Sequence, residues 1–517
     1  MAQSIRSILI VGGGTSGWIT AAFLNRFLDP ARCRITLIES AALGTIGVGE
    51  ATVPPLVGLL RLLQIPEDEF LRECHATYKL GIKFPHWNHA GNAEGGAPRD
   101  ALPPAWHPFG HIGAALVENV PLFHHWLRDH RAGVDGASFT SYSLQALLGD
   151  MNRAPRSLRD ASEIIQTGSY AYHLDARAFA AYLAKIATRR GVEYLVDDVR
   201  HVDLDESGRI REVQTRESGA LKADLYIDCS GFAGLLIEQA LGDRYIDWSD
   251  ALLCDRAVVL PLPAARPMPP YTQATALTAG WTWKIPLSHR VGCGYVYSSK
   301  FLSQDEATAE LLAHAGADPA RSNPGHLRMR IGRRANFWVN NCVSVGLAAG
   351  FLEPLESTGI YLIQRGVEQL LDHFPDADFS PELARSYNAR MAEEFEQVRD
   401  FIILHYLLNR REDTEFWRAN RALRPPDSLA GTLAYYDATG IVDWQARPLF
   451  RETSFYSIAA GFGRLPSRHH AMADQADAGK ARRRMDEIRA RNQAQARLLP
   501  DHAELIDALN ASGAPRA

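Results

Sequence analysis

The sequence predicts a mixed α/β fold, and three observations lead to this prediction. An apolar, β-branched run at residues 7–11 passes through a glycine turn into an apolar helix, and a second strand follows at 33–40. Two further strand-then-glycine segments occur at 223–232 and 340–354. From Pro381 onward the apolar residues recur with helical spacing. Strands that alternate with helices indicate a parallel sheet covered by helices, followed here by a mostly helical region.

The length of the chain predicts two domains. Its 517 residues exceed what one hydrophobic core usually supports. We expect a discontinuous α/β domain from residues 1–90 and 160–375, and a mostly helical domain from 91–159 and 376–517. Gly, Pro, His and Trp crowd the region around 85–125, which predicts a loop-rich insertion.

The C-terminal third is predicted to begin with a helix. Ser380 is suited to cap this helix, and Pro381 to occupy its first position. Its expected apolar stripe consists of Tyr387, Met391, Phe395, Val398, Ile402 and Tyr406.

Composition narrows the class of protein. Hydrophobic residues make up 46% and charged residues 22%, which are ordinary globular values. A net charge of −5 without Lys/Arg runs argues against nucleic acid as a partner. The six cysteines form no CxxC pair, so no metal site is expected, and no apolar stretch approaches about 18 residues, so no membrane span is expected. We therefore expect a cytoplasmic protein.

A Gly-x-Gly-x-x-Gly motif at 12–17, with an acid at the end of the next strand, predicts a dinucleotide site. Glycines permit the tight turn and let a pyrophosphate approach the backbone, and the helix beyond offers free N–H groups. The acid is suited to accept the ribose hydroxyls. The expected cofactor residues are Gly12, Gly14, Thr15, Ser16, Gly17 and Glu39. The alternative is a tight turn that binds nothing.

Later segments favour FAD over NAD. The strand-then-glycine segments at 223–232 and 340–354 are spaced as in FAD-dependent folds, where the chain returns to the flavin. No second glycine fingerprint is present, so a separate nicotinamide site is not evident.

Five motifs together resemble the flavin-dependent tryptophan halogenases. They are GGGTSGW near the start, GVGEATVP at 47–54, YKLGIKF at 78–84, WTWKIP at 281–286 and EPLESTGIY at 353–361. The resemblance covers roughly residues 5–365 and implies a Rossmann-like FAD domain of the flavin monooxygenase type with an added substrate-binding subdomain. It adds three expected cofactor residues, Glu50, Ala51 and Gly346.

The resemblance implies a two-component reaction. A separate NAD(P)H-dependent flavin reductase would supply reduced FAD, which reacts with oxygen and with chloride or bromide. The resulting hypohalous acid would travel through the protein to a distant indole. A barrier is then required that passes a small oxidant and keeps the aromatic substrate away from the flavin.

Residues 281–286 are suited to form such a barrier. In a strand, Trp281 and Trp283 face one side and Lys284 the other. The alternative is that two large side chains simply pack into a core. In the family, these tryptophans, with Ile285 and Pro286, are interpreted as a separator along the tunnel.

Lys79 matches the catalytic lysine of the family. It follows a helix that Pro66 and an acidic first turn open, and we expect it near the C-terminal end of that helix. Its ammonium would hydrogen-bond hypohalous acid or become a haloamine. The alternative is a solvated lysine, and Lys83 is the nearby competitor.

Glu356 matches the second catalytic acid of the family, suited to orient the halogenating species and accept the ring proton. The alternative is a capping or salt-bridging carboxylate. Thr358 and Gly359 open an apolar helix whose N–H groups would bind halide, and Ser357 is expected on the substrate side.

Other candidates depend on the loop-rich insertion. His107, Phe109 and His111 lie where the family carries a substrate-stacking His and Phe, although packing within the loop is the alternative. The His pairs at 124–125 and 469–470 lack further ligands nearby, and we expect no metal there.

The sequence departs from the family at the substrate clamp. Members that act on free tryptophan carry a Tyr-Tyr pair and, six residues later, a Glu that binds the ammonium. Here Tyr435 and Tyr436 are followed at that spacing by Val442. Loss of a charge-assisted hydrogen bond of about 1.5–3 kcal/mol disfavours free tryptophan and favours indole, a substituted indole or a larger indole-bearing molecule.

Two alternative functions remain open from the sequence. An aromatic flavin monooxygenase would hydroxylate its substrate, need no halide and oxidise NAD(P)H directly. A flavin-binding protein without turnover would act as a carrier or sensor. The sequence leaves open the ring position, the halide, the reductase and whether the chain forms a homodimer.

Overall fold

The computed structural model describes residues 4–41, 49–89, 102–157, 169–443 and 449–512. Contacts divide the chain into two units, which are described one after the other. Unit 1 consists of Met1–Ala76, Leu174–Leu252 and Arg328–Val398. Unit 2 consists of Thr77–His173, Leu253–Leu327 and Arg399–Ala517.

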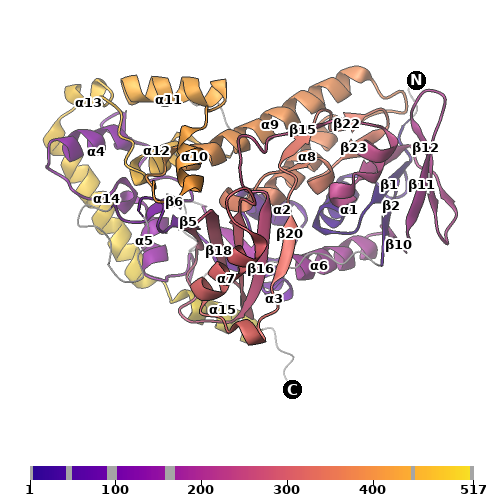
Figure 1. Ribbon diagram of the computed structural model, residues 1–517, viewed down its shortest axis with the longest axis horizontal. Coiled ribbons are helices and arrows are strands. Elements are labelled where there is room, and N and C mark those ends of the chain that lie inside the picture. The colour runs from indigo at the N-terminus through magenta and orange to yellow at the C-terminus, as the bar shows by residue number, and fades with distance from the viewer. Residues whose placement is uncertain (1–3, 42–48, 90–101, 158–168, 444–448, 513–517) are drawn as a thin grey trace. The chain divides into compact units, whose positions relative to one another are not determined.

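Unit 1 is built on a six-stranded sheet in the order β10-β2-β1-β14-β23-β22, parallel except for β22 (Figure 1). Both faces of a parallel sheet are covered, which explains the nearly continuous apolar runs of its strands. The strands are β1 (Ser7–Val11), β2 (Arg34–Glu39), β10 (Glu193–Val196), β14 (Leu225–Asp228), β22 (Trp338–Val339) and β23 (Cys342–Ser344). The predicted parallel α/β sheet is confirmed.

Helix α1 follows β1 directly and packs against α6 and α8. It has buried residues over most of its length, as expected for a helix that lies on a sheet and under other helices. The helices of unit 1 are α1 (Thr15–Phe27), α2 (Pro55–Leu62), α3 (Glu67–Glu73), α6 (Ala176–Arg189) and α8 (Gly359–Asp372). Two small three-stranded sheets also belong to the unit. One consists of β11 (Val199–Leu204), β12 (Ile210–Thr215) and β13 (Ala220–Leu221), and the other of β15 (Tyr245–Asp247), β21 (Gly332–Arg334) and β24 (Gly350–Phe351).

Unit 2 is built on a seven-stranded sheet in the order β20-β16-β19-β18-β17-β5-β6. Neighbouring strands from β16 to β6 run antiparallel except β17 and β5. The strands are β5 (Gly81–Phe84), β6 (Ala105–Pro108), β16 (Arg256–Pro263), β17 (Thr272–Leu277), β18 (Gly280–Pro286), β19 (Arg290–Tyr297) and β20 (Gly325–Arg328). Helix α7 (Gln304–Ala315) contacts β16 and β19, and Leu311 joins Val258 and Tyr295 in a buried cluster.

The observed units differ from the expected domain boundaries in four described segments. Residues 77–89, 169–173 and 253–327, expected in the α/β domain, belong to unit 2, and residues 376–398, expected in the helical domain, belong to unit 1. The reason is the hydrogen-bond ladder of the second sheet, in which β5 pairs with β17 and with β6. Strand pairing between distant segments cannot be read from local composition.

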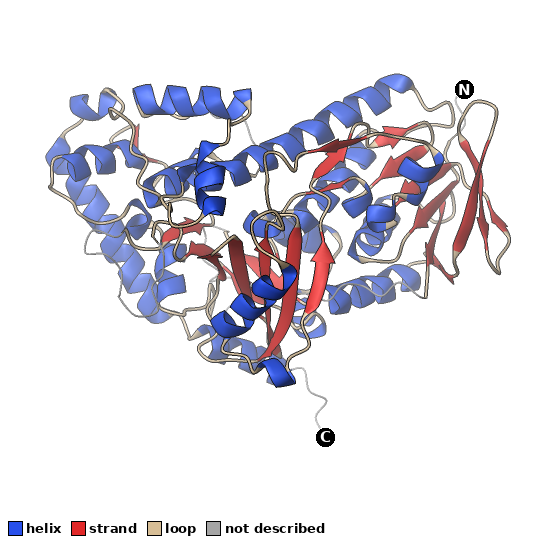
Figure 2. Ribbon diagram, in the orientation of Figure 1, coloured by secondary structure: helices blue, strands red, loops and turns tan. Residues whose placement is uncertain are grey.

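Helices make up most of the rest of unit 2 (Figure 2). They are α4 (Leu122–Arg131), α5 (Leu144–Asp150), α10 (Glu415–Ala422), α11 (Asp427–Thr439), α12 (Glu452–Gly461), α13 (Met472–Gln475), α14 (Ala478–Leu498) and α15 (His502–Ser512). The short strands are β4 (Thr77–Lys79), β7 (Leu116–Val117), β8 (Val120–Pro121) and β9 (Ala171–Leu174).

The helix predicted from Pro381 is confirmed as α9 (Pro381–Leu408). All six residues of its predicted apolar stripe are buried. Its first part belongs to unit 1 and its last part to unit 2. Among the described residues, no helix is both long and apolar enough to cross a membrane.

Candidate functional site

The glycine turn of unit 1 uses each glycine differently. Gly12 has a φ of +115°, and a Cβ there would lie 2.2 Å from the carbonyl oxygen of Cys229. A Cβ on Gly17 would lie 1.9 Å from the carbonyl oxygen of Gly12, so this glycine lets α1 pack against the turn. A Cβ on Gly14 would meet nothing within 4 Å. Gly14 therefore faces open space at the N-terminus of α1, where the N–H groups of Thr15 and Ser16 favour an anion.

Glu39 ends β2 beside this turn. A Cβ on Gly13 would lie 2.2 Å from the carboxyl group of Glu39, which shows how closely the acid approaches the turn. The hydroxyl of Tyr194 donates a hydrogen bond of 2.9 Å to Oε2 of Glu39, and its ring contacts Trp18 edge-on at 5.1 Å. Burial, and then the hydrogen bond to Glu39, raise the pKa of Tyr194 to about 12. Sequence reasoning missed Tyr194, because only the pairing of β10 with β2 brings it to Glu39.

The two later glycine segments join the sheet of the first strand, and their return to the flavin stays a prediction. β14 pairs with β1, and β23 pairs with β14. Gly346 follows β23 with a φ of +72°, and a Cβ there would lie 2.6 Å from Cβ of Ser16. The segment after β23 therefore lies against the start of α1, which explains why a glycine is needed at this position.

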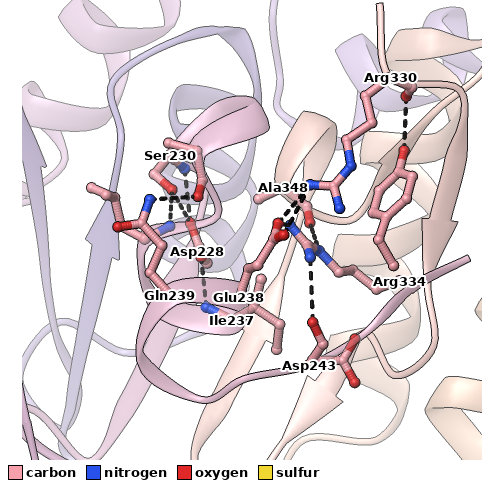
Figure 3. Close-up of polar contacts among 12 residues, drawn as sticks. Asp228, Ser230, Ile237, Glu238, Gln239, Asp243, Arg330, Arg334 and Ala348 are labelled. Carbon is pink, nitrogen blue, oxygen red and sulfur yellow. Dashed lines mark hydrogen bonds and ion pairs between the residues drawn. The ribbon is translucent and has the colours of Figure 1, made fainter.

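A buried polar network supports these segments (Figure 3). Asp228 accepts hydrogen bonds of 2.8 Å from the backbone N–H groups of Leu236 and Ile237. Arg334, 1% exposed, donates from Nε to the carbonyl oxygen of Ala348 at 2.9 Å and forms an ion pair with Glu238. Arg334 thus holds the turn that carries Gly346. Arg334 was not predicted, because nothing in its local sequence distinguishes it from a surface arginine.

These residues of unit 1 fit a bound dinucleotide. Gly14 leaves room at a helix N-terminus, Glu39 offers a carboxylate, and Gly346 brings a third segment to the same turn. Glu50 and Ala51 form the short strand β3 (Glu50–Ala51), and burial raises the pKa of the Glu50 carboxyl to about 7. Their role as cofactor residues stays a prediction.

The segment of Glu356 ends in a strained turn. A 3₁₀ turn (Pro354–Glu356) is followed by Ser357, whose φ of +61° lies in the left-handed region that non-glycine residues rarely adopt. Thr358 is the N-cap of α8, and Gly359 is its first residue. Glu356 and Thr358 are buried, at 0% and 1% exposure. The first N–H groups of α8 thus lie beside a buried carboxyl group, and their role in binding halide stays a prediction.

Lys79 is buried in unit 2. It is the last residue of β4 and is 0% exposed, with Nζ 5.1 Å from the ring centroid of Phe109. The expectation that it sits near the C-terminal end of the preceding helix was wrong, because α3 ends at Glu73 and the chain enters a strand. Lys83, by contrast, is partly exposed and forms a salt bridge of 2.7 Å with Asp150.

An aromatic cluster lies in the same unit and consists of His107, Phe109, Phe401 and Phe450. Phe401 and Phe450 stack with ring centroids 4.0 Å apart, and His107 lies 5.3 Å from Phe401 and 6.4 Å from Phe109. The expectation that His107 lies in a loop was wrong, since it belongs to β6, which pairs with β5. Sequence reasoning missed Phe401, which looked like any apolar residue of α9.

Trp281 and Trp283 lie on one face of β18, as predicted, and together are called the tryptophan wall. Their role as a barrier stays a prediction. The rings of Trp281 and Trp283 lie 6.3 Å apart and are 1% and 6% exposed. A Cβ on Gly294 of the neighbouring strand would lie 2.2 Å from the Trp283 ring, so this glycine makes room for the indole. Ile285 and Pro286 continue the same strand.

The region of the missing clamp is packed with apolar and aromatic groups. Val442 is buried, and the buried Tyr436 donates from its hydroxyl to the carbonyl oxygen of Arg464 at 2.9 Å. Tyr435 is 44% exposed. Trp444, which follows the clamp position, lies outside the described residues.

His111 and the two His pairs lie elsewhere in unit 2. His111 lines a cavity of about 110 Å³ together with Phe123, Arg451 and Tyr456, among others. Nδ1 of His124 accepts a hydrogen bond of 3.2 Å from the backbone N–H of His470. Burial and neighbouring histidines lower the pKa of His124 to about 3. Among the described residues, no three or more His, Cys, Asp or Glu side chains are grouped so that they could hold a metal ion.

Comparison with known proteins decides the family. The family model described as tryptophan halogenase matches residues 7–478. Tryptophan 7-halogenase RebH of Lentzea aerocolonigenes is 40% identical over 90% of this chain and 91% of its own. Among solved structures, Xcc4156, a flavin-dependent halogenase from Xanthomonas campestris, has a TM-score of 0.90 at 37% identity, with 98% of this chain and 99% of that chain covered.

The chain belongs to the tryptophan halogenase family. A second solved relative, BrvH, a flavin-dependent halogenase from Brevundimonas sp. BAL3, has a TM-score of 0.89 at 38% identity and covers 98% of this chain and 99% of its own. This chain is therefore a flavin-dependent halogenase, which uses a flavin, a halide and a separate flavin reductase. The hydroxylase and the non-catalytic flavin protein, which the sequence had left open, lose their support.

Proposed function

We propose that the protein uses reduced FAD, O2 and chloride or bromide to halogenate an indole-bearing small molecule. In the first balanced step, reduced FAD, O2, halide and one proton give FAD, hypohalous acid and water. In the second step, hypohalous acid replaces one ring hydrogen by halogen and releases water. The observation that carries the proposal is Lys79, an ammonium-bearing side chain that is fully buried with Nζ 5.1 Å from an aromatic ring. Burying a lysine costs stability, which points to a functional reason.

The residues of unit 1 bind the cofactor and the halide in this proposal. The turn at Gly12 and Gly14 and the first N–H groups of α1 hold the pyrophosphate, and Glu39 accepts the ribose hydroxyls. The first N–H groups of α8, at Thr358 and Gly359, hold the halide ion. When bound, reduced FAD supplies the two electrons that reduce O2.

The residues of unit 2 guide and direct the oxidant. Trp281 and Trp283 keep the aromatic substrate on its own side, while hypohalous acid is small enough to pass. The ammonium group of Lys79 donates a hydrogen bond to hypohalous acid, or its amine takes the halogen as a haloamine. His107 and Phe109 stack against the indole.

Glu356 completes the proposed chemistry. A buried carboxylate is suited to orient the halogenating species and to accept the proton that the ring carbon loses. The ring proton then leaves through Glu356, and the halogen remains on carbon.

In this proposal, the binding site does not require an amino-acid head group on the substrate. Val442 occupies the position of the ammonium-binding Glu of tryptophan-specific members, and its side chain is buried. We therefore favour indole, a substituted indole or a larger indole-bearing molecule over free tryptophan, although relatives such as RebH are named for tryptophan.

Mass spectrometry tests the proposed function. The protein is incubated with FAD, an unrelated flavin reductase, NADH and either halide, with indole and tryptophan as parallel substrates. We expect a halogenated indole that depends on the reductase and on the halide. NADH oxidation without the reductase, coupled to a hydroxylated product, would contradict the proposal.

A further inference from the structure

Strand β4, which ends in Lys79, is held by two buried histidines that the proposed reaction does not use. Nδ1 of His173 lies 3.2 Å from Oγ1 of Thr77, and Nε2 of His173 lies 2.9 Å from Oγ1 of Thr272. Oγ1 of Thr77 in turn lies 2.6 Å from the carbonyl oxygen of Pro286. Thr77 and His173 are 0% exposed, and Thr272 is 4% exposed.

The second histidine contacts the backbone of the same strand. Nε2 of His502, the first residue of α15, lies 3.1 Å from the backbone nitrogen of Tyr78, and Nδ1 of His502 lies 2.8 Å from the carbonyl oxygen of Met268. We refer to His173, Thr77, Thr272, Pro286 and His502 together as the β4 clamp. All five residues belong to unit 2.

The positions of the protons in the β4 clamp follow from the carbonyl group at its end, which can only accept a hydrogen bond. The carbonyl of Pro286 can only accept, so the single hydroxyl proton of Thr77 is used there. Thr77 can then only accept from His173, which places a proton on Nδ1 of His173. Burial, with the nearby charge of Lys79 and with His502, holds the pKa of His173 well below its usual range, so the ring is neutral. Nε2 therefore accepts from the hydroxyl of Thr272.

The same reasoning settles His502. The Met268 carbonyl requires a proton on Nδ1, and the backbone N–H of Tyr78 requires an acceptor at Nε2. These two demands suit only the neutral ring with its proton on Nδ1. Burial lowers the pKa of His502 to about 4, which agrees with a neutral ring at neutral pH.

We infer that the β4 clamp positions Lys79 relative to the tryptophan wall, with His173 and His502 held as neutral Nδ1–H tautomers. Thr77 and Lys79 are two residues apart on one strand and so project from the same face. The hydroxyl of Thr77 ties this face to Pro286, the last residue of the strand that carries Trp281 and Trp283. The clamp thus connects the wall to the strand that presents the ammonium group.

The inference assigns positioning roles that go beyond the proposed function and rest on it. Backbone hydrogen bonds hold the next residue too, since Leu80 donates to Pro270 at 2.7 Å and accepts from Phe109 at 2.9 Å. The side-chain groups of the clamp add to the backbone pairing of β4 with β9, in which Thr77 lies opposite His173, and they hold Thr77 and Tyr78 just before Lys79. A misplacement of about 1 Å at a reacting group can cost roughly 100-fold in rate.

The proton order is tested on the wild-type protein without turnover. ¹⁵N-histidine labelling and long-range ¹⁵N–¹H correlation distinguish protonated from unprotonated ring nitrogens, and His173→Asn and His502→Gln assign the two signals. We expect Nδ1–H in both rings at neutral pH. An Nε2–H tautomer or a doubly protonated ring at His173 would overturn the inference.

The positioning role is tested by how much oxidant reaches the substrate. Thr77→Val keeps the shape of the side chain but removes the hydroxyl, and we expect the halogenated product formed per flavin oxidised to fall roughly tenfold. The amount of hypohalous acid that an added trap captures should rise correspondingly, while the FAD affinity stays unchanged. Thr77→Ser restores the hydroxyl and should recover most of the product. Thr275→Val, at another buried threonine of β17, is the matched control.

The outcomes separate this inference from the proposed function. If the wild type forms no halogenated indole compound, the proposed function fails and the role of the clamp in positioning Lys79 fails with it, while the tautomers still test the proton order. If the wild type is active but Thr77→Val yields as much product per flavin as Thr275→Val, the proposed function stands and the clamp is only structural.

Discussion

Unit 1 and unit 2 present their functional groups in different ways. In unit 1 the expected binding groups are mostly backbone N–H groups at helix N-termini, and Gly14 leaves open space beside those of α1. In unit 2 they are large side chains, Lys79, the aromatic cluster and the tryptophan wall, which burial holds in place. Backbone sites follow from local turns, whereas side-chain sites depend on the packing of distant strands. Substitutions in the two units should therefore fail in different steps of the reaction.

The largest expected effect separates chemistry from cofactor binding. Lys79→Ala should abolish halogenated product, by several powers of ten at about 1.4 kcal/mol each, while FAD binding and flavin reoxidation continue. The product rate, FAD affinity and trapped hypohalous acid would be measured together. Lys83→Ala is the matched control and should have little effect, because Lys83 is partly exposed and paired with Asp150. A Lys79→Ala variant with more than about a tenth of the product rate would show that Lys79 does not transfer halogen.

A pair of glycine variants tests the backbone character of unit 1. Gly14→Val should weaken FAD binding at least roughly tenfold, because the new side chain enters the open space at the α1 N-terminus. The apo fold should tolerate it, since a Cβ at Gly14 meets nothing within 4 Å. Gly17→Ala should instead destabilise the fold by about 1–3 kcal/mol, because its Cβ would meet the Gly12 carbonyl oxygen. Flavin titration measures the FAD affinity of both variants, and thermal unfolding measures their stability. A Gly14→Val variant that loses stability but keeps its FAD affinity would contradict the prediction.

Substrate preference tests the side-chain character of unit 2. Because Val442 replaces an ammonium-binding Glu, kcat/KM for indole or 3-substituted indoles should match or exceed that for tryptophan. Val442→Glu should raise kcat/KM for tryptophan relative to indole by roughly 10- to 150-fold, which corresponds to one charge-assisted hydrogen bond of about 1.5–3 kcal/mol. Competition assays with both substrates measure this ratio. A wild type that clearly prefers tryptophan would mean that another residue binds the amino-acid group.

The smallest expected effect is a pH dependence of stability in unit 1. Burial raises the pKa of Glu50 to about 7 from 4.5, so between these values the folded protein keeps a proton that the unfolded chain releases. The contribution of Glu50 to stability is therefore fully present below about pH 4.5 and is lost as the pH rises through about 7. Glu50→Gln should flatten this part of the thermal unfolding profile. Identical pH profiles for wild type and variant would contradict the expected pKa.

The sequence by itself determined the parts of the protein that depend on local chain geometry. The glycine spacing at 12–17, the acid at Glu39 and the alternation of Trp281 and Trp283 each predicted a feature that the structure contains. Helix α9 and its apolar stripe followed from the period of buried residues. A turn, a strand face or a helix face is decided by neighbours within a few residues, so the pattern is visible in the sequence.

Only the tertiary structure decided which distant residues meet. The pairing of β5 with β17 moved 77–89 into unit 2, and the pairing of β5 with β6 placed His107 in a strand. Tyr194 contacts Glu39, and Arg334 contacts Ala348, which lies 14 positions further along the chain. His173 and His502 contact β4, and 424 positions separate Tyr78 from His502. Such contacts leave no local signal, because burial and strand pairing depend on how the whole chain folds back on itself.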